Sequence, residues 1–441
     1  MTHNPGETRL PDSSTSEPAP PDVELALSAR GAALLAALGE RVVVADGAMG
    51  TMLQSHDLTL DDFEGLEGCN EILNVTRPDV VRDVHEAYFA IGVDCVETNT
   101  FGANLANLGE YDAAHRVAEL AEAGARLARE VADAYSTAAA PRWVLGSVGP
   151  GTKLPTLGHA AYADLRDAYQ AEVGGLIGGG ADAIIVETAQ DLLQAKAALV
   201  GARRAMVAAG ARLPLIAQVT VETTGTMLLG SEIGAALTAL EPLHVDVLGL
   251  NCATGPAEMS EHLRYLSKHA LVALSCMPNA GLPELTRDGA HYPLTPAQLA
   301  EAHDAFTADY GLSLVGGCCG TTPEHLRLVV QRVQGRTVTP RRPRPEPGAA
   351  SLYQTVSFRQ DTAYMSIGER TNANGSKAFR EAMLEEKWED CLEIARSQTR
   401  DGAHLLDLSV DYVGRDGVAD MRSLAGRLAT ASTLPLVLDS T

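Results

Sequence analysis

The chain has 441 residues, enough for two or three domains, with 34 basic and 57 acidic residues and a formal net charge of −23. This acidic balance argues against nucleic acid or an anionic membrane as a partner. Residues 1–22 are rich in Pro, Ser, Thr and Glu and lack the basic and apolar regions of a secretory signal, so we expect a disordered tail and a cytoplasmic location. No apolar run reaches membrane-spanning length.

Eight short apolar runs follow, each typical of a strand that is buried on both faces of a parallel sheet. They are residues 42–45, 93–96, 143–146, 183–186, 215–219, 245–250, 271–274 and 312–315. Stretches with helical periodicity separate them, which indicates βαβ units. Eight units in roughly 290 residues predict an α/β fold with a (β/α)8 TIM barrel over residues 23–335. A doubly wound open sheet is the competing fold, but the segment DGAMG (46–50) does not fit a dinucleotide-binding turn.

A second βα pattern follows a linker rich in Pro and Arg. The linker, residues 336–350, is typical of a semi-rigid, extended connection. The expected elements of the second unit are strands at 365–368, 404–408 and 436–439 and helices at 379–402 and 421–432. Three strands cannot close a barrel, so residues 351–441 are predicted to be the first three βα units of a truncated second barrel.

Three cysteines follow two of the predicted barrel strands. Cys252 ends the sixth strand, and Cys318 and Cys319 end the eighth within the Gly-rich sequence GGCCG. Because active sites of such barrels lie at the carboxyl ends of the strands, these thiols are expected to converge on one metal ion. The alternative is a cysteine pair that only fills a tight turn. The remaining cysteines, at positions 69, 95, 276 and 391, are expected to be small buried hydrophobic residues.

A site with three sulfur ligands predicts a particular chemistry. Structural zinc is usually closed by four protein ligands, whereas catalytic zinc keeps a position open for substrate. A free thiol has a pKa of about 8.5 and reacts as the thiolate, which zinc stabilises at neutral pH. The expected substrate is therefore itself a thiol, and the expected reaction is alkyl transfer to sulfur.

Two acidic residues stand at neighbouring strand ends. Asp46 follows the first strand and Glu187 the fourth, so either could bind a substrate amino group. The backbone N–H groups of residues 46–50 could bind a carboxylate. The alternative role for each acidic side chain is a helix cap or an ion pair.

Six segments resemble the zinc-dependent homocysteine S-methyltransferase family over residues 40–335. They are DGAMG, ETNTFGAN, IVETAQD, GLNCATGP, MPNAG and VGGCCGTTPEH. The resemblance implies zinc ligation by Cys252, Cys318 and Cys319. It also implies that the amino acid part of homocysteine is held by four residues, Asp46, Gly47, Thr98 and Glu187. Asn279 in MPNAG is similar to a residue that covers the metal when substrate is absent.

The segment IGERTN (367–372) resembles the start of the pterin-binding barrel of the cobalamin-dependent methionine synthase family. The resemblance implies pterin contacts for Glu369, Asn372, Asp407 and Asp439, although Ser409 stands where Asn is often seen. It further implies 5-methyltetrahydrofolate as methyl source and methylcobalamin bound by a domain absent from this chain.

These patterns predict a methyltransferase that transfers a methyl group from methylcobalamin to zinc-bound homocysteine and forms methionine. The expected partners are homocysteine and a cobalamin module, in the same polypeptide or supplied in trans. Three alternatives stay open: S-methylmethionine or betaine as donor, a fragment that binds zinc and homocysteine without turnover, and a structural zinc scaffold with four ligands.

Overall fold

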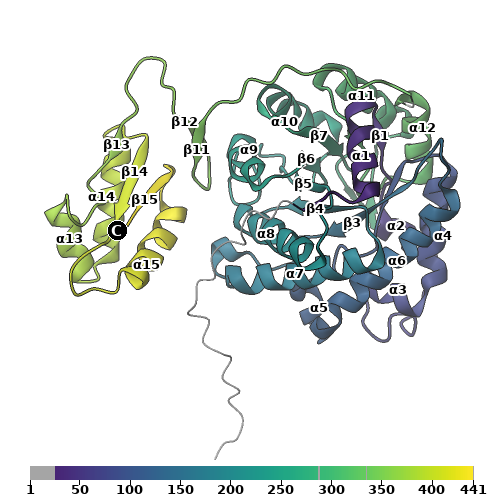
Figure 1. Cartoon of the computed structure of the whole chain (residues 1–441), viewed down its shortest axis with the longest axis horizontal. Coiled ribbons are helices and arrows are strands. Elements are labelled where there is room, and N and C mark those ends of the chain that lie inside the picture. The colour runs from purple at the N-terminus through teal and green to yellow at the C-terminus, as the bar shows by residue number, and fades with distance from the viewer. Residues whose placement is uncertain (1–24, 287–288, 334, 441) are drawn as a thin grey trace, which may run out of the picture.

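The computed structural model describes residues 25–286, 289–333 and 335–440, and the predicted disordered tail at 1–22 lies outside them. The chain forms a large βα unit followed by a smaller one (Figure 1). Among the described residues, no helix combines the length and the apolar character needed to cross a bilayer. The cytoplasmic location stays a prediction, as do the domain boundaries.

Eight parallel strands form the sheet of the large unit, in the order β1-β10-β7-β6-β5-β4-β3-β2. They are β1 (Val43–Val44), β2 (Cys95–Glu97), β3 (Trp143–Val148), β4 (Ala183–Ala189), β5 (Leu215–Val219), β6 (Val247–Asn251), β7 (Ala273–Met277) and β10 (Leu314–Val315). From β2 to β10 each strand of this sheet pairs with the next one along the chain, and β1 pairs with β10, as in a nearly closed barrel and unlike a doubly wound sheet. The predicted (β/α)8 barrel is therefore confirmed.

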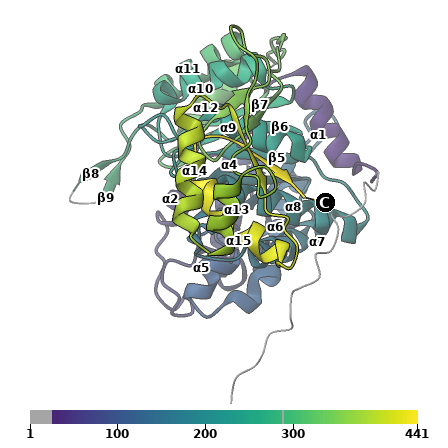
Figure 2. The same ribbon diagram turned by 90° about the vertical axis from the view of Figure 1, so that its left-hand side faces the viewer.

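Helices surround this barrel and bury an apolar core against the strands (Figures 1 and 2). They are α1 (Ala29–Glu40), α2 (Met49–Leu53), α3 (Leu73–Thr76), α4 (Pro78–Ala90), α5 (Leu105–Glu110), α6 (Val117–Tyr135), α7 (Tyr162–Gly179), α8 (Leu192–Ala209), α9 (Ile233–Leu240), α10 (Pro256–His269), α11 (Pro296–Tyr310) and α12 (Pro323–Val333). Short 3-10 turns lie at Asn70–Ile72, Ala114–Arg116, Pro155–Leu157 and Glu241–Leu243. A hairpin of β8 (Glu284–Thr286) and β9 (Gly289–His291) extends from the β7–α11 connection (Figure 2).

An aspartate precedes each of three even-numbered strands and ties it to the strand before it. The carboxylates of Asp94, Asp182 and Asp246 accept the backbone N–H groups of Val44, Val144 and Leu215, respectively. In each pair the aspartate's own N–H donates back to the carbonyl of the same partner. The two hydrogen bonds between Asp94 and Val44 join β1, the first strand of the barrel, to β2, the second.

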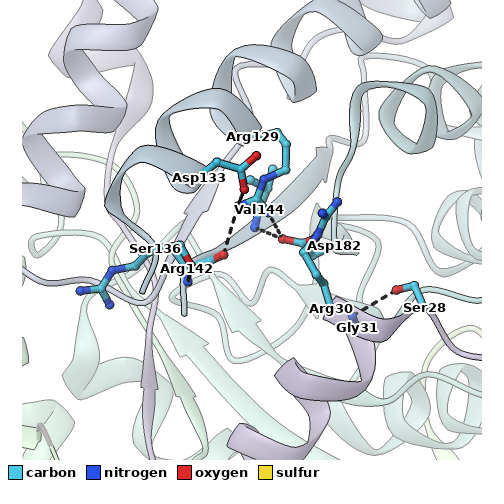
Figure 3. A network of polar contacts seen from close by, with 9 residues as sticks. All are labelled: Ser28, Arg30, Gly31, Arg129, Asp133, Ser136, Arg142, Val144 and Asp182. Atoms are coloured by element: carbon cyan, nitrogen blue, oxygen red, sulfur yellow. Dashed lines mark hydrogen bonds and ion pairs between the residues drawn. The ribbon is translucent and has the colours of Figure 1, made fainter. Parts of the chain in front are cut away.

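Asp182 also anchors two arginines at this amino-terminal end of the barrel (Figure 3). Arg129 of α6 and Arg30 of α1 both pair with its carboxylate, which is 1% exposed. Arg129 is itself 9% exposed and forms a second ion pair, at 2.8 Å, with the exposed Asp133. Side chains at the amino-terminal end of such a barrel serve stability rather than catalysis.

We expect Asp182→Ala to lower the free energy of unfolding by about 3–5 kcal/mol, because it leaves the buried guanidinium of Arg129 without its buried carboxylate partner. Asp133→Ala removes the exposed partner of the same Arg129 and should cost at most about 1 kcal/mol. Urea unfolding of both variants measures the difference. Equal losses for the two variants would contradict the role assigned to Asp182.

The smaller unit contains a three-stranded parallel sheet in the order β13-β14-β15. Its strands are β13 (Ile367–Gly368), β14 (Leu405–Ser409) and β15 (Leu436–Asp439), and its helices are α13 (Lys377–Leu384), α14 (Trp388–Arg400) and α15 (Gly417–Ala431). The three predicted βα units are confirmed. The single helix expected at 379–402 is wrong: the chain breaks it at Glu386, whose φ of 53° is left-handed.

A second hairpin lies between the two units (Figure 1). It pairs β11 (Gly348–Ala350) with β12 (Thr355–Ser357), so the predicted extended linker ends in a strand. The Tyr353 carbonyl accepts the N–H of Glu232, and the Tyr353 hydroxyl donates to the Thr430 carbonyl at 2.7 Å. The hairpin therefore contacts both the barrel and α15.

Candidate active site

The three predicted thiols lie together at the carboxyl ends of β6 and β10. The Sγ atoms of Cys252, Cys318 and Cys319 are all within 4.8 Å of one another, and those of Cys252 and Cys319 are 3.9 Å apart. Cys252 and the next residue, Ala253, have left-handed φ values of 59° and 55°. Such backbone at residues other than glycine is strained and typical of functional sites.

The backbone of the GGCCG loop is fixed by hydrogen bonds from both sides. The Cys318 N–H donates to the Pro278 carbonyl, and the Cys319 N–H donates to Oδ1 of Asn279 at 3.0 Å. Thr321 donates through its hydroxyl to the Cys318 carbonyl at 2.7 Å. At Gly317 a Cβ atom would lie 2.4 Å from the Thr321 hydroxyl oxygen, so only glycine fits there.

The thiols open into a pocket of about 530 Å³ at this end of the barrel. Its wall consists of Gly47, Ala48, Met49, Gly50, Thr51, Gln54, Asn70, Glu71, Glu97, Thr98, Asn99, Phe101, Ser147, Glu187, Thr188, Cys252, Tyr292, Gly317, Cys318 and Cys319. Among these described residues there are three glutamates and no Lys, Arg or His. The wall is thus suited to a cationic group, such as an ammonium, beside a sulfur.

Glu187 has a hydrogen-bond partner on each of its carboxylate oxygens. Its Oε1 accepts the Ser147 hydroxyl at 2.5 Å, and its Oε2 lies 3.1 Å from Nδ2 of Asn251. Burial in the pocket wall raises the pKa of this carboxyl to about 7. A bound ammonium would favour the charged form and restore the lower pKa.

Glu97 was not among the predicted site residues, yet it lines the same pocket. Burial, followed by the nearby carboxylates of Glu187 and Asp46, raises its pKa well above the ordinary range. Its buried Oε1 has no hydrogen-bond partner among the described residues. A buried polar atom without a partner is costly in free energy, and a ligand donor can satisfy it.

Asp46 is buried and is not among the residues that line the pocket. Both of its carboxylate oxygens accept the N–H of Glu97 at 3.1 Å. This hydrogen bond joins the carboxyl end of β1 to that of β2. Gly47 follows Asp46, and a Cβ there would lie 2.4 Å from the Thr321 hydroxyl. The substrate contact predicted for Asp46 stays a prediction.

Thr98 and Asn279 hold the surrounding backbone. Thr98 lines the pocket and accepts the Ser147 N–H through its hydroxyl at 2.9 Å. Asn279 is buried behind Cys319 and uses Oδ1 to hold that residue's N–H. The metal-covering role predicted for Asn279 stays a prediction.

The donor set and its spacing fit zinc. Zn–S bonds of about 2.3 Å in a tetrahedron place sulfurs about 3.8 Å apart, close to the 3.9 Å between Cys252 and Cys319. No fourth Cys, His, Asp or Glu of the described residues joins the group. Hydrogen bonds from the other two thiols lower the pKa of Cys319, while the same contacts raise that of Cys318.

The four predicted pterin residues follow the three strands of the smaller unit. Nδ2 of Asn372 donates to Asp407 at 2.9 Å. Asp439 is in register with Ser409 across β14 and β15, and Glu369 is exposed after β13. These side chains share one end of the sheet, and their pterin contacts stay predictions.

Several contacts of the pocket were missed by sequence reasoning. Ser147 and Asn251, which hold Glu187, come from the ends of β3 and β6. Tyr292 packs against Gly320, where a Cβ would lie 2.2 Å from the ring. Glu97 precedes the predicted site residue Thr98, and Asn251 precedes the predicted ligand Cys252. This neighbourhood at a strand end is the sequence feature that indicates a place in the site.

Comparison with known proteins gives two family matches. The homocysteine S-methyltransferase family matches residues 43–333, about two thirds of the chain, and the pterin binding enzyme family matches residues 368–441. The methionine synthase of Mycobacterium tuberculosis (strain ATCC 25618 / H37Rv) is 65% identical to this chain over 408 residues. That of Mycobacterium leprae (strain TN) is 64% identical to this chain over 414 residues. Each match covers 92% of this chain and 34% of the relative, so the chain spans about a third of their length.

Among solved structures, the metallated form of the homocysteine methyltransferase MmuM from Escherichia coli matches with a TM-score of 0.56 and 23% identity. The match covers 69% of this chain and 99% of that one, and it supports the barrel fold alone. The family assignment rests on the sequence match across the whole barrel, including both cysteine segments. The chain therefore belongs to the homocysteine S-methyltransferase family of enzymes, and the segment after its barrel matches the pterin binding enzyme family.

Proposed function

We propose that the barrel methylates the sulfur of homocysteine, held at a zinc ion on Cys252, Cys318 and Cys319, and so forms methionine. The observation that carries this proposal is the convergence of three thiols on a pocket whose other ionisable side chains are carboxyl groups and Tyr292. Zinc bound to three thiolates would keep a substrate thiol ionised and nucleophilic at neutral pH. Three protein ligands are the pattern of catalytic zinc, which argues against a closed structural site.

The chain's own residues would bind and orient the amino acid. The carboxylate of Glu187, held by Ser147 and Asn251, is the proposed partner of the substrate ammonium. Glu97 lines the same pocket, and its buried Oε1, which has no partner among the described residues, is the proposed second acceptor. The segment 47–50 lines the pocket as well, and its backbone N–H groups are the proposed contacts of the substrate carboxylate.

We further propose methylcobalamin as the immediate methyl donor, with 5-methyltetrahydrofolate as the methyl source. The pterin-binding match over residues 368–441 and the identity to two methionine synthases support this donor. A cobalamin module, in the same polypeptide or in trans, would carry the methyl group to the thiol pocket. S-methylmethionine or betaine as donor, and binding without turnover, are the alternatives.

Methionine formation by the zinc-loaded chain tests the proposal. Homocysteine is supplied with methylcobalamin, S-methylmethionine or betaine in parallel reactions, each repeated after zinc removal. We expect zinc-dependent product with methylcobalamin alone. Product from another donor would contradict the cobalamin assignment, and bound homocysteine without product from any donor would favour the binding fragment.

A further inference from the structure

Asn251 lies between the two halves of the proposed substrate site. Its Nδ2 is 3.1 Å from Oε2 of Glu187 and 3.9 Å from Sγ of Cys318. It is 1% exposed, so these contacts are made away from solvent. One side chain therefore contacts both the carboxylate proposed for the ammonium and a thiol proposed for the metal.

The orientation of the Asn251 amide is fixed by its other partners. Its Oδ1 accepts the Thr188 N–H at 2.7 Å. In the flipped orientation the Asn251 NH2 group would face this N–H, and two donors would then point at each other. Nδ2 is also 2.8 Å from the Thr188 hydroxyl oxygen. Its two hydrogens are therefore shared among three acceptors, on Glu187, Thr188 and Cys318. Thr188 has a left-handed φ of 54°, which the bond to Asn251 helps to hold.

The backbone around Asn251 joins three consecutive strand ends. The Thr220 hydroxyl, after β5, donates to the Asn251 carbonyl at 3.0 Å, and the Thr220 N–H donates to Ala189 at the end of β4. Cys252 then begins the strained turn that carries its thiol inward. Asn251 is thus tied through its backbone to the ends of β4 and β5 and lies next to the thiol of Cys252 in the chain.

We propose that Asn251 is a positioning residue that fixes the spacing between the ammonium site and the sulfur site, and so makes the pocket select homocysteine over cysteine. The two amino acids differ by one methylene between the ammonium-bearing carbon and the sulfur. A mismatch of one methylene in a fitted site changes affinity by about 10- to 200-fold. This inference rests on the proposed function, because it assumes that Glu187 and the thiols bind the two ends of one substrate.

Two variants separate positioning from folding. Asn251→Asp keeps an oxygen for the Thr188 N–H but loses the donor to Glu187 and Cys318, whereas Asn251→Ala loses both. Gln218→Glu is the matched control, because Gln218 is another buried carboxamide, in β5, which donates to the Ser275 hydroxyl at 3.0 Å. The full chain is loaded at saturating zinc, and the dissociation constants for L-homocysteine and L-cysteine are measured by calorimetry.

We expect the wild-type chain and Gln218→Glu to prefer homocysteine by at least about tenfold, within the range for one methylene. Asn251→Asp and Asn251→Ala should lower that preference to within about threefold of unity and weaken zinc binding by about 10- to 100-fold. An unchanged preference in Asn251→Asp, or its failure to fold where the wild type folds, would overturn the inference. A wild-type chain that binds neither amino acid would instead contradict the proposed function.

Discussion

Replacement of Cys319 by alanine is expected to abolish stoichiometric zinc binding and to lower the rate of methionine formation by at least about 1000-fold, or about 4 kcal/mol of barrier. The reason is the donor set: the described residues offer only three ligands within reach of one ion, and two thiolates cannot hold a catalytic zinc. Metal analysis of the purified variant and a single-turnover assay measure both effects.

Cys276→Ala is the matched control for this variant. Cys276 is a fully buried thiol on β7 that contacts Met259 and is not part of the thiol group. Its loss should cost about 1 kcal/mol of stability through a small cavity and leave the zinc content unchanged. Normal zinc content in Cys319→Ala, or loss of zinc in Cys276→Ala, would contradict the assignment of the ligands.

Glu187→Gln is expected to weaken homocysteine binding by about 10- to 150-fold, because a charged hydrogen bond to the ammonium contributes about 1.5–3 kcal/mol. The substitution keeps the shape of the side chain and one carbonyl oxygen to accept from Ser147 or Asn251. Calorimetry on the zinc-loaded chain measures the loss.

Mercaptobutyrate, which is homocysteine without its amino group, distinguishes this effect from general damage to the pocket. It should bind the wild-type chain and Glu187→Gln with equal affinity, since it presents no ammonium to the carboxylate. A parallel loss for both ligands would show that Glu187 supports the pocket wall instead of the substrate.

Regular elements of this chain were predictable because each follows from a local pattern. The eight barrel strands are continuous apolar runs, and parallel strands buried on both faces have that pattern. The carboxyl ends of these strands meet at one rim, so the convergence of Cys252 with Cys318 and Cys319 followed once the barrel was recognised.

Irregular features were not predictable from periodicity. The helix expected at 379–402 breaks at Glu386, because a single left-handed residue ends α13 without any Gly or Pro to indicate it. The β8–β9 and β11–β12 hairpins have three-residue strands, too short for an alternation pattern to be detected.

Side-chain partners across the barrel also required the structure. Asn251 contacts Glu187 over a separation of 64 residues, and nothing in the segment GLNC distinguishes this amide from a cap or a turn. The hydrogen bond from the Glu97 N–H to the Asp46 carboxylate likewise joins β1 to β2, and the position of Asp46 after β1 does not indicate it. Such pairings depend on which strand ends become neighbours.

X-ray absorption at the zinc edge measures the number of sulfur ligands on zinc in the 441-residue chain, and this number tests directly whether a substrate thiol joins the metal. The three thiols and the pocket beside them predict three sulfurs per zinc without substrate and four after addition of L-homocysteine. Four sulfurs before addition, or a count that L-homocysteine does not change, would contradict the claim that this site binds and activates a substrate thiol.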